Sequence, residues 1–311
     1  MSVAYLIASH TNPSQVARLV RRIRAERPVA PIVVHHDRLQ SRLSADTFPD
    51  DEHIFFVEPS IAGEWGSYAL VQLALNGLET LWSSGEEFRW VTFISGQDYP
   101  ARSLREFEAA LPATGDGAIE RGDERPQSVM RYRLGFYRLP ERLETRNMHR
   151  LFFVLGILAK LFDRKQRFVA FTTGRVGCRF GIVHPKSPVA GLRIYKGYQW
   201  WTLSRAAVAY VRDYIERNPD FVAWFATRVL IPDEAFFQTI LMTSDMKFAK
   251  DDGRYVKWRH ADAMSPEILT IDDLPDILRS ERFFARKFYD RVDARVLDEL
   301  DRGSLGHELR L

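Results

Sequence analysis

The sequence lacks several features that mark secreted and membrane-spanning proteins. Among its 311 residues there is a single cysteine, Cys178, so no disulfide can form within the chain, and a reducing compartment, most simply a bacterial-type cytoplasm, is expected. The amino terminus is apolar only over residues 3–8 and lacks the basic start of a signal peptide. The most apolar run, Leu151 to Phe162, is interrupted by Lys160 and is shorter than the roughly 20 residues that cross a bilayer. We therefore expect no transmembrane helix.

Several ligand-binding motifs are also absent from the sequence. The chain has neither a Gly-rich phosphate loop nor a Cys/His array with zinc spacing. It contains no Asp-x-Asp pair either, although nucleotide-sugar enzymes often use such a pair to hold a divalent metal on the diphosphate. If the chain binds a nucleotide-sugar, basic side chains must neutralise the phosphates instead. No metal or other cofactor is expected.

Composition and length are those of a soluble globular protein. Hydrophobic residues make up 46% of the chain and charged residues 27%. A net charge of +3, from 44 basic and 41 acidic residues, is too balanced to indicate nucleic-acid binding. Without an internal repeat or long linker, we expect one continuous domain. Its parts would be a nucleotide-binding α/β half over about 1–115, an acceptor-binding and catalytic half over about 116–295, and a tail over 296–311.

The first hundred residues alternate between apolar strands and amphipathic helices. Strands are predicted at Val3–Ala8, Pro31–His35, Ile54–Val57 and Trp90–Ile94, and helices at Pro13–Arg24 and Ser67–Trp82. This alternation predicts an α/β fold with a Rossmann-like first half, in which ligand-contacting residues follow the carboxyl ends of strands. His10, Asp37 and the pair Gln97-Asp98 fall at such ends.

The pattern is less regular after Gly117. Strands are predicted at Ala118–Glu120, Gln199–Leu203 and Tyr255–Trp258, and helices at Ser204–Arg217, from Pro232 onward, at Asp273–Arg279 and at Phe283–Phe288. The segment Ile231-Pro232-Asp233-Glu234 is typical of a helix start, because proline suits the first helical position and acidic residues complement the helix dipole. Glu234 is therefore either a structural acid of a helix start or a functional carboxylate at the mouth of the helix.

Eight short motifs keep a common order over roughly residues 3–290. They are the segments 4–10 (AYLIASH), 33–37 (VVHHD), 65–67 (WGS), 94–100 (ISGQDYP), 197–201 (GYQWW), 232–234 (PDE), 256–258 (VKW) and 284–288 (FARKF). Together they resemble the core-2/I-branching β-1,6-N-acetylglucosaminyltransferase and peptide O-xylosyltransferase family, which is glycosyltransferase family 14, and the last motifs are most similar to its xylosyltransferase-like branch. The resemblance implies a GT-A-like fold with a mixed sheet, a UDP-sugar donor, inversion at the anomeric carbon and no metal requirement.

The resemblance also implies roles for residues of the donor site. Glu234 would be the general base that takes a proton from the acceptor hydroxyl. Asp37 would accept a hydrogen bond from the uracil imide, or else act as a turn or helix-cap aspartate. Trp65 would pack on the uracil face, or else belong to the core. Ala8 and His10 would line the base pocket, although His10 is equally compatible with a satisfied histidine at a strand end.

The phosphate ligands are less completely matched. Lys287 corresponds to the family lysine that contacts the diphosphate, or else is a solvated lysine. The mammalian branch pairs this lysine with an upstream arginine, but the corresponding place here is Met264-Ser265-Pro266. Arg254, Arg259 and Arg286 are the candidates to replace it.

For the acceptor, the resemblance assigns Glu120 to sugar hydroxyls and Trp258 to the face of the acceptor ring. Trp200 and Trp201 would extend the same wall, with at least one of them in the core because strand residues alternate between faces. Asp98 would either hydrogen-bond donor hydroxyls or brace its own loop.

The apolar segment 151–162 has two interpretations. Its basic neighbours are Arg150, Lys160, Arg164, Lys165 and Arg167. An amphipathic helix with such flanks rests on an anionic bilayer in some proteins, where it approaches a lipid-linked acceptor. A buried helix is the commoner outcome for such a run and is the one expected here.

The sequence thus predicts a metal-independent, inverting glycosyltransferase that moves a sugar of the N-acetylglucosamine or xylose class from a UDP-sugar to a glycan, lipid-linked or peptide acceptor. We expect a cytoplasmic enzyme that lies, if segment 151–162 contacts a bilayer, on the inner face of the membrane. The alternative is a catalytically inactive glycan- or nucleotide-binding protein of the same fold, which the missing upstream arginine favours.

Overall fold

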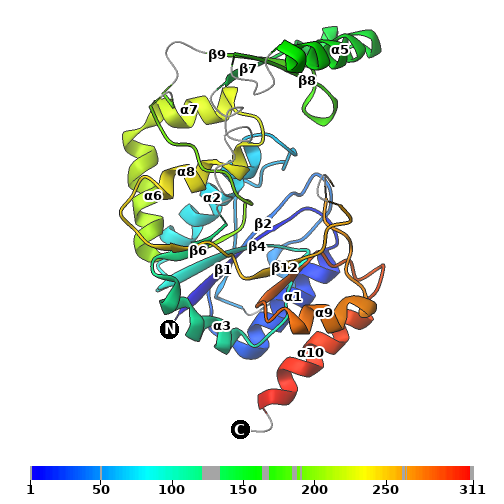
Figure 1. The fold of residues 1–311 in the computed structure, drawn as a ribbon. Coiled ribbons are helices and arrows are strands. Elements are labelled where there is room, and N and C mark those ends of the chain that lie inside the picture. The colour runs from blue at the N-terminus through cyan, green and yellow to red at the C-terminus, as the bar shows by residue number, and fades with distance from the viewer. Residues whose placement is uncertain are drawn as a thin grey trace.

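Within the residues that the structure describes, seven strands form a mixed central sheet (Figure 1). The computed structural model describes residues 2–49, 51–120, 134–162, 168–183, 188, 189, 191–260, 263 and 265–308. In spatial order the strands are β11 (Phe248–Ala249), β6 (Gly117–Ile119), β10 (Trp201–Ser204), β4 (Trp90–Ser95), β1 (Val3–Ser9), β2 (Ile32–His36) and β3 (Ile54–Phe56). The four amino-terminal strands are parallel, and β10 is antiparallel to β4 and β6. The predicted α/β fold with its mixed sheet is confirmed.

Helices cover both faces of this sheet. The helices packed on one face are α2 (Ala69–Ser83), α6 (Arg205–Arg217), α7 (Pro219–Arg228) and α8 (Phe236–Leu241). Those on the other face are α1 (Pro13–Glu26), α3 (Leu104–Ala110), α9 (Leu274–Arg279) and α10 (Arg295–Glu308). Strand β1 shows why: Ala4 and Leu6 belong to the first hydrophobic cluster, whereas Tyr5 and Ile7 belong to the second. Both faces of the strand are buried, as its continuous apolar run requires.

One secondary-structure expectation for the carboxyl-terminal part is wrong. Residues 284–286 form strand β13 (Phe284–Arg286) rather than a helix, and they pair with β5 (Asp98–Pro100) and β12 (Arg254–Val256). The four-residue spacing of the buried Phe284 and Phe288 imitates a helical face, but hydrogen bonding on both edges decides for a strand. The presumed tail contains most of α10, whose first turns are buried in the second cluster.

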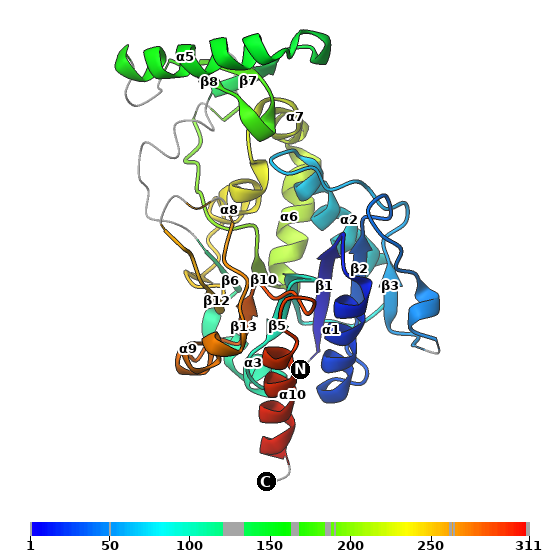
Figure 2. The same cartoon turned by 90° about the vertical axis from the view of Figure 1, so that its right-hand side faces the viewer.

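A separate small module lies at the end of the molecule opposite α10 (Figures 1 and 2). It consists of the antiparallel strands β7 (Leu134–Arg138), β8 (Val169–Thr172) and β9 (Arg179–Val183), with α5 (Arg146–Phe162) lying across them. Its inner side packs on α7, where Trp224 lies against Gly135. We call these residues, 134–162 and 168–183, the α5 module.

The expectation of a buried helix over residues 151–162 is wrong. In α5 only Phe152 and Ala159 are buried. The large apolar side chains of α5 that are 44–91% exposed are Leu151, Phe153, Val154, Ile157, Leu158, Leu161 and Phe162. The basic neighbours Arg164, Lys165 and Arg167, like Met264, lie outside the described residues. None of the helices in the described part of the chain has the length and apolar character that crossing a bilayer requires.

Candidate active site

Two cavities meet above the carboxyl ends of β1, β2 and β4. The strand-end cavity, of about 330 Å³, is lined by residues that follow these strands, among them Ala8, His10, Asp37 and Gln97. The Glu234 cavity, of about 240 Å³, is lined among others by Tyr198, Glu234, Asp252, Trp258 and Ser265. Trp65, Gln199, Trp200 and Arg286 line both. The chain thus brings most of the residues predicted for donor and acceptor to one continuous site.

Asp37 ends β2 and lies in the wall of the strand-end cavity, as the sequence predicts. Its carboxylate accepts hydrogen bonds from the backbone N–H groups of Leu39 (3.0 Å) and Gly63 (3.1 Å) and from the side chain of Gln40 (3.2 Å). It therefore performs the turn-capping role that the sequence allowed. A carboxylate has about four acceptor sites, so Asp37 keeps capacity for a ligand N–H as well.

Two histidines support the floor of this cavity. His35 is buried and its Nε2 accepts a hydrogen bond from the N–H of Ile61 (3.1 Å). His36 is also buried and joins Ser9 (2.8 Å) to Ser41 (3.0 Å). Burial lowers the pKa of both imidazoles, which favours their neutral forms. They position the pocket backbone, while the exposed His10 faces the cavity itself.

Glu234 lies in a 3₁₀ turn, Pro232–Glu234, and α8 starts only at Phe236. The turn follows Ile231, whose left-handed backbone (φ 52°, ψ 56°) is strained for a β-branched residue. The N–H of Ile231 donates to the carbonyl of Gly66 (3.1 Å), and the carbonyl of Glu234 accepts from Gly197 (2.8 Å). Both flanks of the turn are therefore fixed, which holds the Glu234 side chain at the cavity wall.

Lys196 is a site residue that the motifs do not reveal. Its Nζ lies 3.2 Å from Oε2 of Glu234, and the two side chains are 36% and 26% exposed. The lysine directly precedes Gly197, which cannot be replaced because an added Cβ would lie 1.8 Å from the carbonyl oxygen of Glu120. The sequence shows only a lysine next to a glycine, and the fold is what places this lysine beside Glu234.

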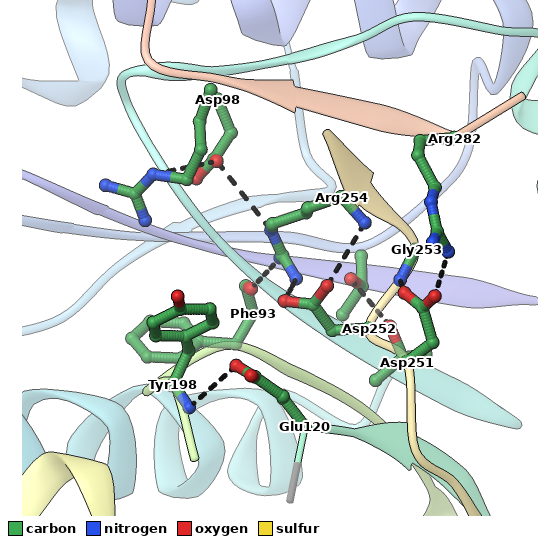
Figure 3. Close-up of polar contacts among 12 residues, drawn as sticks. Phe93, Asp98, Glu120, Tyr198, Asp251, Asp252, Gly253, Arg254 and Arg282 are labelled. Atoms are coloured by element: carbon green, nitrogen blue, oxygen red, sulfur yellow. Dashed lines mark hydrogen bonds and ion pairs between the residues drawn. The ribbon is translucent and has the colours of Figure 1, made fainter. Parts of the chain in front are cut away.

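A buried ionic cluster connects β5, β12 and β13, which form a three-stranded sheet beside the site (Figure 3). Asp98 is fully buried, and its Oδ1 lies 3.7 Å from Nε of Arg254 and 3.7 Å from Nε of Arg286. Arg254 also binds Asp252 (3.0 Å) and donates to the carbonyl of Phe93 (2.5 Å). Asp98 therefore braces its surroundings, and its burial argues against the direct contact with donor hydroxyls that the sequence also allowed.

Among the three candidate arginines, Arg286 is the one that lines both cavities. Its guanidinium lies 4.5 Å from the centre of the Trp200 ring. Burial lowers the pKa of Arg286 and the charge of Asp98 opposes that shift, so the group stays cationic. The Arg254 side chain is 1% exposed in the cluster, whereas the Arg259 side chain is 80% exposed and pairs with Glu267.

Lys287 follows Arg286 at the edge of the Glu234 cavity. Its Nζ donates to Oγ of Ser265 (2.5 Å), which lines that cavity. Burial and the charge of Arg286 both lower the pKa of Lys287. An anion bound beside both side chains would raise the pKa of Lys287 and so oppose the effect of Arg286, because the two cations would then share one counter-charge.

Aromatic side chains form the remaining walls. Tyr198 and Trp258 stack with ring centres 6.1 Å apart in the Glu234 cavity. Trp200 lines both cavities, whereas Trp201 is fully buried, which confirms that one of the two faces the core. Trp65 is 40% exposed, so it is not a core residue.

Glu120 lies beside the Tyr198 wall of this cavity. Its carboxylate accepts a hydrogen bond from the backbone N–H of Tyr198 (3.2 Å) (Figure 3). Burial raises its pKa from 4.5 to about 7, and the charge of Asp252 adds to the shift. The carboxyl group thus changes charge near neutral pH, within reach of the stacked aromatic pair.

The raised pKa of Glu120 predicts a pH-dependent stability difference. The folded protein keeps this proton to higher pH than the unfolded chain, so the stabilisation is complete below about pH 4.5 and is lost as the pH rises through about 7. Glu120→Gln removes the titration. We expect its melting temperature relative to wild type to rise between pH 5 and pH 8, measured by thermal unfolding. A difference that stays constant over this range would contradict the assignment.

Comparison with known proteins shows which family the chain resembles. The family model described as "Branch: Core-2/I-Branching enzyme" matches residues 3–278. The chain is 22% identical over 326 residues to the Danio rerio protein "Beta-1,3-galactosyl-O-glycosyl-glycoprotein beta-1,6-N-acetylglucosaminyltransferase 4", which covers 96% of the chain and 68% of that protein.

Two further relatives match over shorter parts of their own length. "Beta-glucuronosyltransferase GlcAT14B" of Arabidopsis thaliana is 27% identical over 125 residues, or 39% of the chain and 28% of that protein. "Xylosyltransferase oxt" of Drosophila pseudoobscura pseudoobscura is 23% identical over 257 residues, or 76% of the chain and 26% of that protein. The chain thus spans less than a third of the length of either protein.

Proposed function

The chain belongs to the core-2/I-branching enzyme family, and from this membership we propose that it is an inverting glycosyltransferase with a GT-A-like fold. It would move a sugar from a UDP-sugar to a hydroxyl group of a glycan or other glycoconjugate. The names of the relatives place N-acetylglucosamine, xylose and glucuronic acid among the sugars to be tested.

One observation carries this proposal: Arg286 lies in the wall shared by the two cavities. A nucleoside diphosphate-sugar has three chemically distinct parts, which need a base pocket, a cation and a reaction site in that order. The strand-end cavity with Asp37 supplies the first, Arg286 the second, and the cavity of Glu234 the third. The base, diphosphate and sugar of the ligand therefore follow one another in the same order as the strand-end cavity, Arg286 and the Glu234 cavity.

In the proposed reaction, Glu234 takes the proton of the acceptor hydroxyl as its oxygen attacks the anomeric carbon. The bond from that carbon to the β-phosphate oxygen breaks, and UDP leaves with an additional negative charge. Arg286 and Lys287 stabilise that charge, since preorganised cations act most strongly where charge develops. Trp258 and Tyr198 hold the acceptor ring, and Glu120 binds its hydroxyl groups. Asp98 contributes by holding Arg286 in place.

We further propose that the enzyme works in the cytoplasm at the inner face of a membrane, where segment 151–162 makes a peripheral contact. A lipid-linked glycan would then be an accessible acceptor. The exposed apolar face of α5 supports this location.

Calorimetry with UDP tests the donor site directly. We expect UDP to bind equally well with and without EDTA, because protein cations rather than a metal neutralise the diphosphate in this proposal. Hydrolysis or transfer from UDP-N-acetylglucosamine, UDP-xylose and UDP-glucuronic acid should likewise persist in EDTA. Binding without any turnover would favour the inactive binding protein, and loss of binding in EDTA would contradict metal independence.

A further inference from the structure

The outer face of α5 is a continuous apolar surface on a helix that is already bound by its other face. Phe152 packs edge-on against Phe171 of β8, with ring centres 5.8 Å apart. Gly156 brings the two elements close, because a Cβ there would lie 3.2 Å from the carbonyl oxygen of Phe171. The helix is therefore held in place by β8. Since β8 packs on the opposite face of α5, it does not cover the exposed apolar residues.

Helical spacing gathers the exposed side chains on one stripe. Positions three and four residues apart lie on the same face of a helix. The seven exposed apolar residues of α5 follow this spacing from Leu151 to Phe162, and Phe162 is 91% exposed. The helix itself lies at the outer end of the molecule in both views (Figures 1 and 2). Seven large exposed apolar side chains on one face of a helix are unusual for a protein surface that stays in water.

Charge identifies what covers this face. The described residues of the α5 module include seven Lys or Arg and two Glu, a formal net charge of +5. The whole chain carries +3, so the rest of it carries −2. Arg146 and Arg150 are exposed and continue the apolar stripe toward the start of the helix. Cations at a helix start oppose the helix dipole, so helix stability does not explain them.

We propose that α5 is an interfacial helix that docks the protein on an anionic phospholipid surface. The apolar stripe inserts at the level of the acyl boundary, and Arg146, Arg150 and Lys160 reach the acidic headgroups with their long side chains. A second copy of the chain is a poorer occupant, because pairing these faces would bring two modules of +5 charge together.

The module connects this surface to the cavities. Val176 of the module packs against the same small buried cluster as Ile231, which directly precedes the Pro232–Glu234 turn. The same side chain lies 3.1 Å from the place a Cβ would take on Gly66, next to Trp65. A docked α5 therefore holds the rim of the Glu234 cavity at a fixed height above the lipid surface. The docking rests on the α5 surface and does not depend on the transfer chemistry.

Sedimentation of the full chain with vesicles tests the proposal. We expect binding to phosphatidylcholine vesicles that contain about one third phosphatidylglycerol, weaker binding at high salt, and little binding to phosphatidylcholine alone. The double variant L161S/F162S should bind at least ~10-fold more weakly. The matched control L39S/L278S replaces apolar residues that are 85% and 54% exposed elsewhere, and it should bind like wild type.

Three results would overturn the docking model: no binding of the wild type, equal binding of L161S/F162S, or a wild-type dimer in solution that this variant dissociates. The last would assign the face to a second copy. Failure of docking and failure of the transferase proposal are distinguishable, because E234Q should sediment with vesicles like wild type. Conversely, L161S/F162S should keep its activity toward a water-soluble acceptor.

Discussion

Replacing Glu234 with glutamine is expected to lower the rate of sugar transfer by about 10²–10⁴-fold, which is the usual contribution of a general base. Glutamine has nearly the same shape but does not accept the acceptor proton. The strained backbone at Ile231 and the hydrogen bond from Gly197 do not involve the changed atoms, so the turn should keep its geometry. UDP should bind E234Q with unchanged affinity by calorimetry, because Glu234 lies in the cavity beyond Arg286.

The control for this experiment is Glu267→Gln. Glu267 is a partly exposed glutamate that pairs with Arg259 and Lys257, and it does not line either cavity. It should retain full activity. An E234Q variant with wild-type turnover would remove Glu234 from the mechanism and return it to the role of a structural acid. A variant that loses UDP binding as well would instead show a disturbed site.

The sheet was largely predictable because its signals are local. Continuous apolar runs such as 3–9 and 90–95 are strands in the structure within one residue of the expected bounds. Sequence periodicity was ambiguous where helix and strand patterns coincide. The segment Phe284–Phe288 has its two buried phenylalanines four residues apart, and only pairing with the distant β5 and β12 makes its first part a strand.

The α5 stripe shows a second limit of sequence patterns. An apolar face with basic flanks has the same periodicity whether another layer of protein or a lipid surface covers it. The outcome depends on topology: β8 takes one face of α5, and the module lies at the end of the molecule. That arrangement is a property of the whole fold, and the sequence of residues 146–162 alone does not determine it.

The candidate site shows the same division. The family resemblance, together with the strand-end position of Asp37, identified Asp37, Glu234 and Trp258 as candidate site residues, and all three line the cavities. The sequence did not show which way each side chain points, and this orientation decides which of the neighbouring arginines faces the cavities. Arg286 points to Asp98 and Trp200 because β13 pairs with β5 in a particular register, whereas Arg259 follows the end of β12 and is solvent-exposed.

Replacing Arg286 with alanine is expected to lower kcat/KM for the UDP-sugar by about 10²–10⁴-fold. Two charge-assisted hydrogen bonds to the diphosphate, at about 1.5–3 kcal/mol each, account for a loss of this size. The affinity for UDP should fall with it, in contrast to E234Q. The variant should also unfold more easily, by about 3 kcal/mol, because Asp98 stays buried with one arginine instead of two.

The change in stability has to be separated from the change in binding. Arg286→Lys keeps a cation near Asp98 but loses the planar fork that suits a diphosphate, so it should be more stable than R286A and still bind UDP weakly. Arg259→Ala removes a side chain that is 80% exposed and should leave both affinity and rate unchanged. If R259A rather than R286A loses UDP binding, the second phosphate ligand has been misplaced. The shared wall of the two cavities would then no longer mark the position of the diphosphate.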